Sequence, residues 1–210
     1  MIPNPVDIKK IHESLENSPS PYKPGSIHLV SVGRLNYQKG YDLLLKILKQ
    51  CLEKVKELHL TIMGEGSEEK SLKKMAAELE LGDSVCFIGH QDNPYPFMNH
   101  ADLFISSSRW EGLPNAVLES LACGTPVLAF DCPGGTNEII VDDKNGWLVP
   151  SEDIEAMSGK IVALVRQKKW LKFKNEVLLP EKFICENVVR SYEKIMIKSN
   201  SDIISRSFAA

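Results

Sequence analysis

The sequence predicts an α/β fold in which a doubly wound parallel sheet is covered by helices on both faces. Short runs of β-branched and other apolar residues alternate with amphipathic helical segments from residue 26 onward. Most of the strand-like runs are almost continuously apolar, which is typical of strands buried on both faces. Because alternating strands and helices are joined by right-handed crossovers, we expect the strands to be parallel.

Each element of this alternation can be located. Six runs have the length and composition of strands: Ile27–Val32, Leu58–Met63, Val85–Ile88, Leu103–Ser106, Pro126–Phe130 and Trp147–Val149. Amphipathic segments with apolar residues at helical spacing lie between or after them: Asp42–Lys54, Glu68–Glu80, Pro114–Ala122 and Ile154–Gln167. Pro114 stands where a helix begins, which is the helical position that proline favours.

The two ends of the chain lie outside the alternation. Residues 1–25 contain five prolines, so they are expected to be a linker with at most one short helix around Ile8–Leu15. Residues 26–180 would form the domain. Residues 181–198 would form a final helix, centred on Phe183–Ile197, and the serine-rich residues 199–210 a flexible tail.

Composition excludes several functions. With 210 residues, of which 43% are hydrophobic, the chain can bury the core of one ordinary domain. A formal net charge of −3 argues against a nucleic-acid partner. The five cysteines are dispersed, without a C-x-x-C pair or histidines at metal-ligand spacing, so we expect buried thiols in a reducing compartment and no metal site.

Ligands of doubly wound folds bind at the carboxyl ends of the strands, so the loops there are the candidate site. The loop after the first strand carries Arg34 and Lys39, two cations that suit phosphate oxygens, although ordinary surface cations would give the same pattern. The loop after the fourth strand runs into a helix whose first amides could bind an anion. Glu111 and Glu119 flank that helix start and could accept hydrogen bonds from ligand hydroxyls, or could be an N-terminal dipole partner and an exposed helix residue.

A third loop, residues 134–138, follows the fifth strand. It could be another helix-entry turn beside the same site, or a flexible loop capped by Asn137. The sequence alone leaves both interpretations open.

Together these residues form a recognisable pattern. The run from Glu111 to Glu119 resembles the E-x-x-x-x-x-x-x-E signature of family 4 retaining glycosyltransferases, and Gly33-Arg34-Leu35 with Lys39-Gly40 resembles the diphosphate loop of that family. Further matching motifs occur in the family's order over about residues 1 to 197: Gly64-Glu65-Gly66, Gly89, Asp131-Cys132-Pro133-Gly134-Gly135 with Glu138, and Asn145-Gly146.

The resemblance implies a role for each matching residue. The family has the GT-B fold, two Rossmann-like domains with the active site between them, and this chain is similar to the C-terminal, donor-binding half. Arg34 and Lys39 would neutralise the diphosphate, and Glu111 would contact the donor sugar and act with them in catalysis. Glu119 would hold the ribose hydroxyls. The remaining donor-binding positions would be Gly33, Gly112, Leu113, Pro114 and Asn115 around the diphosphate and sugar, and His90 and Gln91 at the base.

The implied reaction is the transfer of a hexosyl unit, with retention, from a nucleoside diphosphate sugar to a glycan or lipid-linked acceptor. A UDP-sugar donor and surface-polysaccharide biosynthesis are favoured, and neither a metal nor a cofactor is expected. The first residues resemble the family's interdomain linker, so the acceptor domain is expected to be missing from this chain or supplied by a partner subunit. The exposed apolar residues of the final helix (Val188, Val189, Ile195) would mark the interface with it.

Two other functions share this pattern. One is a non-catalytic partner subunit of GT-B fold, and the other is a nucleotide-sugar epimerase. For the transferase, we expect a cytoplasmic location, with peripheral association with the inner face of the membrane left open for the full enzyme.

Overall fold

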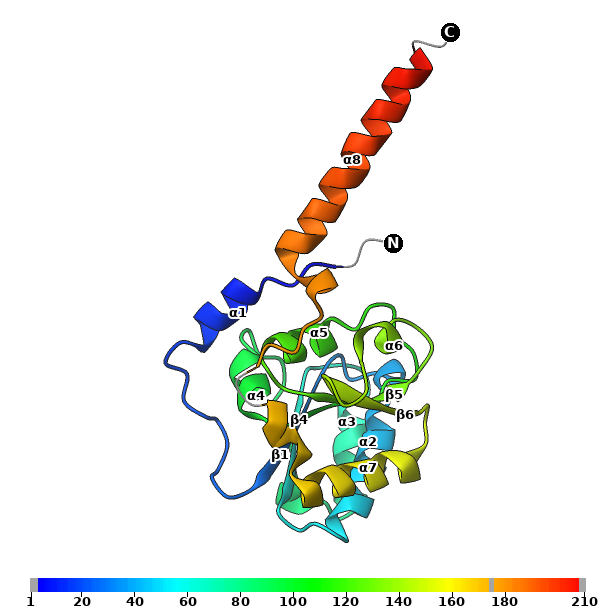
Figure 1. Ribbon diagram of the computed structural model, residues 1–210. Helices are drawn as coiled ribbons and strands as arrows, with labels where there is room; N and C mark the ends of the chain where they lie inside the picture. Colours follow the sequence, from blue (N-terminus) through cyan, green and yellow to red (C-terminus); the bar gives the residue numbers. More distant parts are fainter. Residues whose placement is uncertain (1–3, 174–175, 208–210) are drawn as a thin grey trace.

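The computed structural model describes residues 4–173 and 176–207, and the side chains of that part up to residue 196. Its centre is a six-stranded parallel sheet in the order β3-β2-β1-β4-β5-β6 (Figure 1). The strands are β1 (Ile27–Val32), β2 (Leu58–Met63), β3 (Val85–Phe87), β4 (Leu103–Ser106), β5 (Val127–Asp131) and β6 (Gly146–Pro150). This confirms the predicted fold class, and each predicted strand is present with its ends shifted by one residue at most.

The order of the strands reverses between β1 and β4, which makes that junction the switch point of the sheet. β1 pairs with β2 on one side, from Ile27 opposite Leu58 to Val32 opposite Met63. On its other side β1 pairs with β4, Leu29 lying opposite Leu103. Chain connections leave a switch point in opposite directions, so the loops after β1 and β4 border an open crevice.

Helices cover both faces of the sheet. They are α1 (Ile8–Leu15), α2 (Tyr41–Leu52), α3 (Glu69–Glu78), α4 (Tyr95–His100), α5 (Asn115–Ala122), α6 (Thr136–Ile139), α7 (Ile154–Gln167) and α8 (Cys185–Ser207), with short 3-10 turns η1 (Tyr37–Lys39), η2 (Gly82–Ser84), η3 (Lys169–Phe173) and η4 (Glu181–Phe183). α2 packs against α3 and α7, whereas α1, α4 and α5 pack against one another. The core lies between these layers and the sheet, and includes the fully buried Trp147, Phe104 and Phe130.

Residues of the predicted linker, from Asn4 onward, are fixed on the domain. Val6 forms a β-bridge with Ile184, and Ile11 of α1 is buried. The Tyr22 ring stacks on His28 at a centroid distance of 4.3 Å. α1 is the one short helix that the sequence predicts in this segment.

The structure corrects the predicted C-terminal segment. α8 continues to Ser207, through residues predicted as a flexible tail, because neither glycine nor proline interrupts the sequence after Pro180. Val188 was predicted to be exposed but is buried at the start of α8, whereas Val189 and Ile195 are exposed as predicted. α8 projects away from the sheet (Figure 1).

Two further details differ from the sequence-based expectation. α4 was not predicted, because Pro94 and Pro96 indicate a turn, yet both lie at the start of the helix, where proline is tolerated. All five cysteines are free, but Cys86 is exposed and Cys185 half-buried. No helix in the described part of the chain is long and apolar enough to cross a membrane.

Candidate functional site

Three loops meet at the carboxyl edge of the sheet and form what we call the loop cluster: residues 33–40 after β1, 107–114 after β4 and 132–135 after β5. The backbone amide of Arg109 donates to the carbonyl of Gln38 at 2.8 Å, which joins the first two loops. The amide of Glu111 donates to the carbonyl of Pro133, and that of Gly135 to the carbonyl of Gly112, both at 2.9 Å, which joins the second and third.

Glycine is required where these loops touch. Gly134 has φ +122°, and a Cβ there would lie 1.7 Å from the carbonyl oxygen of Glu111. Gly40 has φ +62°, and a Cβ there would lie 2.1 Å from the carbonyl oxygen of Ser107. A side chain at either position would push the loops apart. The third loop is therefore a helix-entry turn against the second, and α6 begins without the side-chain cap from Asn137 that was the alternative.

An ion pair lies at the centre of the loop cluster. The ammonium of Lys39 is 2.5 Å from Oε1 of Glu111, and the hydroxyl of Ser108 donates to the same oxygen at 2.6 Å. The Glu111 side chain is 6% exposed and that of Lys39 is 21% exposed. Water screens such a pair little, so the two opposite charges hold the side chains together within the loop cluster.

The start of α5 presents unpaired amides beside this ion pair. No side chain caps the helix at Pro114. Within the part of the chain that the structure describes, the backbone amides of Gly112, Leu113, Asn115 and Ala116 donate to no protein acceptor. Unpaired amides at a helix start, with the helix dipole behind them, favour a bound anion.

Arg34, Gly33, His90 and Gln91 line a neighbouring cavity of about 410 Å³. Arg34 is exposed there, and Gln91 is held by a hydrogen bond from its side-chain amide to the carbonyl of Ile88 at 2.8 Å. In the described part of the chain, no hydrogen bond or ion pair joins Arg34 to the Lys39–Glu111 pair. The two cations are instead at opposite ends of one loop, with the Lys39 side chain folded back beside Gly33.

Glu119 and Asn115 line a further cavity, of about 380 Å³, together with Tyr95 and Asn4. Glu119 lies one turn after Asn115 on the same face of α5, and Asn4 donates to the Asn115 side chain at 3.3 Å. Glu119 is half-buried, and the described residues offer it no hydrogen bond or ion pair. Burial therefore raises the pKa of its carboxyl. The interpretation of Glu119 as an exposed helix glutamate is wrong.

The raised pKa of Glu119 predicts a pH-dependent stability effect. The folded chain holds this proton more tightly than the unfolded chain, so its stability falls as the pH rises through the raised pKa. Glu119→Gln is therefore expected to raise Tm at about pH 8 and to leave it unchanged at about pH 3, where both states are protonated. Thermal melts at the two pH values test this, with the exposed Glu57→Gln as control. An equal change in Tm at both pH values would contradict it.

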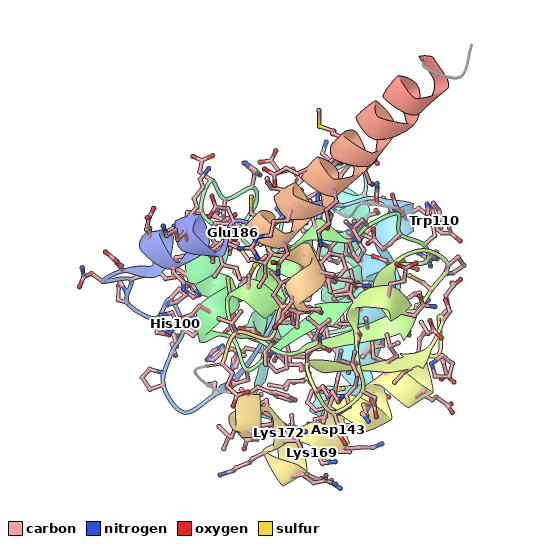
Figure 2. The ribbon with its side chains drawn as sticks, turned by 45° about the horizontal axis from the view of Figure 1, so that its top comes forward. His100, Trp110, Asp143, Lys169, Lys172 and Glu186 are labelled. Carbon is pink, nitrogen blue, oxygen red and sulfur yellow. The ribbon has the colours of Figure 1, made fainter. Side chains whose placement is uncertain are left out.

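Sequence reasoning missed the residues that support this site. Arg109 is 8% exposed and binds both carboxylate oxygens of Asp42 at 2.8 Å. Burial by itself would raise the pKa of Asp42, but the hydrogen bonds and the charge of Arg109 outweigh it and lower that pKa. Ser108 was likewise not singled out. The only sequence signal of Arg109 and Ser108 is that they shortly precede Glu111. Trp110, between Arg109 and Glu111, points outward and is 46% exposed at the rim of the molecule (Figure 2).

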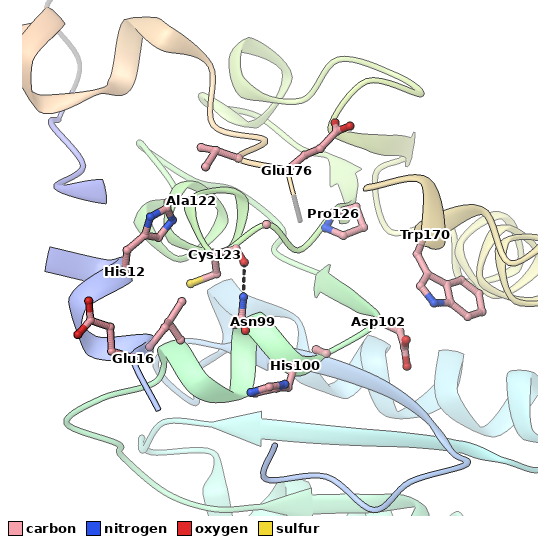
Figure 3. A pocket seen from close by; sticks show the side chains of 14 residues that line it. His12, Glu16, Asn99, His100, Asp102, Ala122, Cys123, Pro126, Trp170 and Glu176 are labelled. Carbon is pink, nitrogen blue, oxygen red and sulfur yellow. Dashed lines mark hydrogen bonds between the residues drawn. The ribbon is translucent and has the colours of Figure 1, made fainter. Parts of the chain in front are cut away.

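Another large cavity lies away from the loop cluster. A cavity of about 600 Å³ lies at the opposite edge of the sheet, where Asn99 donates to the carbonyl of Cys123 at 2.8 Å (Figure 3). It contains none of the predicted site residues. In the part of the chain that the structure describes, no three His, Cys, Asp or Glu side chains gather as metal ligands would.

Comparison with known proteins gives glycosyltransferases among the relatives. The chain is 35% identical over 149 residues to an uncharacterized glycosyltransferase of Methanocaldococcus jannaschii, covering 69% of this chain and 37% of the relative. It is 29% identical over 185 residues to the poly(ribitol-phosphate) alpha-N-acetylglucosaminyltransferase of Staphylococcus aureus, covering 87% of this chain and 35% of the relative. It is also 33% identical over 137 residues to the lipopolysaccharide core biosynthesis glycosyltransferase LpsE of Rhizobium meliloti, covering 65% of this chain and 39% of the relative.

A solved structure agrees with these relatives. A mutant of the S. aureus protein TarM, in complex with fondaparinux, alpha-GlcNAc-glycerol and UDP, superposes with a TM-score of 0.76 at 26% identity, over 84% of this chain and 36% of that one. The first curated relatives are longer than this chain, which spans between 35% and 48% of their length. The family described as glycosyl transferases group 1 matches residues 15–176, most of the chain. The chain therefore belongs to the group 1 glycosyl transferases.

Proposed function

We propose that this chain is the donor-binding, C-terminal half of a family 4 retaining glycosyltransferase of GT-B fold, and that its donor is a UDP-sugar. The observation that carries the proposal is the Lys39–Glu111 ion pair beside the unpaired amides at the start of α5. This arrangement offers a cation and oriented N–H donors to an anion, and a carboxylate to sugar hydroxyls, within one loop cluster.

Two neighbouring cavities would extend this site. Glu119, with no protein partner among the described residues, would accept hydrogen bonds from the ribose hydroxyls. Arg34 would bind phosphate oxygens from the other cavity, where Gly33 allows close approach and the backbone around His90 and Gln91 would receive the base. Leu113 and Pro114 would shape the turn that presents the amides of Gly112 and Asn115.

Catalysis by this half would be electrostatic. As the bond between sugar and diphosphate breaks, the diphosphate gains negative charge and the sugar develops positive charge. Lys39 and Arg34 would stabilise the first charge more strongly in the transition state than in the ground state. The carboxylate of Glu111 would stabilise the second. In this proposal neither a metal nor a cofactor is needed.

The acceptor would be a glycan or a lipid-linked glycan, held by a second Rossmann-like domain that the same polypeptide or a partner subunit supplies. The S. aureus structure supports a UDP-sugar and a sugar acceptor, since it contains UDP together with alpha-GlcNAc-glycerol. Surface-polysaccharide biosynthesis in the cytoplasm, at the inner face of the membrane, is the setting that fits this chemistry.

Titration with UDP and GDP tests the proposal. The chain is expected to bind UDP saturably and more tightly than GDP, and Arg34→Ala is expected to weaken UDP binding by about tenfold, the loss of one charge-assisted hydrogen bond. Arg166→Ala, which removes an exposed arginine from the last turn of α7, is the matched control and should change nothing. Absence of saturable binding of either nucleotide would overturn the proposal.

A further inference from the structure

Arg109 is a buried cation for which the proposed mechanism has no use. Its Nε donates to Glu152 at 3.1 Å, its Nη1 to the carbonyl of Tyr37 and to Asp42, each at 2.8 Å, and its Nη2 to Asp42 at 2.8 Å. A guanidinium has five N–H donors, so the protein itself occupies most of them. The guanidinium carbon also lies 3.9 Å from the centre of the Tyr37 ring. Arg109 is therefore saturated by protein contacts and has little left to offer a ligand.

These contacts join the two loops that carry the reactive charges. The Arg109 backbone binds the carbonyl of Gln38, and its side chain binds the carbonyl of Tyr37, so both ends of the residue hold the loop after β1. Ser107, two residues earlier, donates its hydroxyl to the carbonyl of Lys39 at 3.0 Å. Lys39 and Glu111 each lie within two residues of these inter-loop hydrogen bonds. The hydrogen bonds therefore set the distance between the two side chains.

Asp42 connects this arrangement to the scaffold. It lies in the first turn of α2, which packs against α7 in the body of the domain. Both of its carboxylate oxygens bind Arg109, a bidentate geometry that fixes direction as well as distance. Glu152, from the segment between β6 and α7, binds the third side of the guanidinium but is half-exposed, so it contributes less.

We infer that Arg109, held by Asp42, is the positioning residue that fixes Lys39 and Glu111 relative to each other and thereby sets the affinity for a pyrophosphate-bearing ligand. The inference rests on the proposed function for its ligand. A ligand-binding group that is already held in place loses no conformational entropy when the ligand binds. A small displacement of such a group lowers the affinity strongly. Weakening the hydrogen bonds between Arg109 and Asp42 should therefore weaken ligand binding, although no ligand contact is removed.

The substitution Asp42→Asn separates positioning from simple electrostatics, because the two predict opposite signs. Asparagine removes a negative charge near the anion site, so Coulomb attraction alone would tighten UDP binding. Positioning predicts the reverse, because the amide NH2 of asparagine is a donor and cannot replace the second carboxylate oxygen that accepts from Arg109, and we expect UDP binding about fivefold to tenfold weaker. Asp83→Asn, on the exposed turn η2, is the matched control and should leave the affinity unchanged.

A second measurement tests the contact between the two loops without any nucleotide. In Asp42→Asn, hydrogen exchange of the amides of residues 35–40 and of Arg109 is expected to quicken at least tenfold, while β1 and β4 keep their protection. Arg109→Lys keeps the positive charge but cannot form the bidentate contact with Asp42, so it should give the same exchange pattern. It also keeps the inference testable if Asp42→Asn does not fold. A double-mutant cycle with Lys39→Ala should show that the two losses in UDP affinity do not add.

The possible outcomes are distinct. Unchanged or tighter UDP binding by a folded Asp42→Asn chain, or unchanged exchange in residues 35–40, overturns the inference. Failure of the unmodified chain to bind UDP overturns the proposed function instead, and the exchange measurement then still decides whether Arg109 and Asp42 hold the two loops together.

Discussion

Replacing Lys39 with alanine is expected to weaken UDP binding by about 100-fold, or nearly 3 kcal/mol, the largest loss from any single side chain of the site. Two effects combine. The ligand loses a charge-assisted contact with a cation that is mostly buried, where water screens little. In addition, Glu111 keeps a buried negative charge with no cation beside it, and that charge repels the diphosphate. Isothermal titration of both chains with UDP measures the ratio of their dissociation constants.

The matched control is Lys46→Ala. Lys46 is an exposed lysine of α2 for which the structure gives no ion pair within the described residues, so its removal changes the net charge equally without touching the loop cluster. Binding by Lys39→Ala within about threefold of the control would mean that this ammonium does not contact the ligand. The central observation behind the proposed function would then be lost.

Gly134→Ala is expected to have the largest effect on stability, because it separates two loops that touch through their backbones. An alanine Cβ would lie 1.7 Å from the carbonyl oxygen of Glu111 and would also have to adopt φ +122°. Backbone strain and steric overlap each cost about 1 to 3 kcal/mol. We therefore expect a decrease in Tm of roughly 10 °C, measured by differential scanning calorimetry. Because Glu111 must move, UDP binding should weaken as well.

Gly159→Ala provides the opposite expectation for the same chemical change. Gly159 lies inside α7, and a Cβ there would meet nothing within 4 Å. Alanine is the better helix former by about 1 kcal/mol, so this variant should be slightly more stable than the unmodified chain. Equal shifts in Tm for the two variants would contradict the view that the contact between the loops, rather than glycine content, limits stability.

Much of the fold could be predicted because its causes are local. Apolar runs such as Leu58–Met63 indicate buried strands by composition alone, and Pro114 and the apolar spacing of Ile154–Gln167 indicate helices. The errors also have local causes. α4 was missed because its first turn contains proline, and α8 was ended too early because serine-rich sequences often fray but nothing in this one forces a helix to stop.

The candidate site was only partly predictable. The motif around Glu111 and Glu119 directed attention to loops that contact one another in the structure, because strand ends in a parallel sheet meet at one edge. The environments of the two glutamates could not be predicted from the motif. The buried ion pair of Glu111 depends on Lys39, 72 residues earlier, and the unpaired state of Glu119 depends on which side chains fold over α5. Arg109 looked like one more loop cation, and its bidentate partner Asp42 is 67 residues away.

The sequence by itself determined the alternation of elements, the parallel sheet and the motifs that identify the family, since each depends on spacing along the chain. Only the tertiary structure decided which charges are buried together, where glycine lets two backbones touch, and which amides stay unpaired. These depend on contacts between residues far apart in the sequence, and the strength of a charge or hydrogen bond is set by the burial that those contacts create.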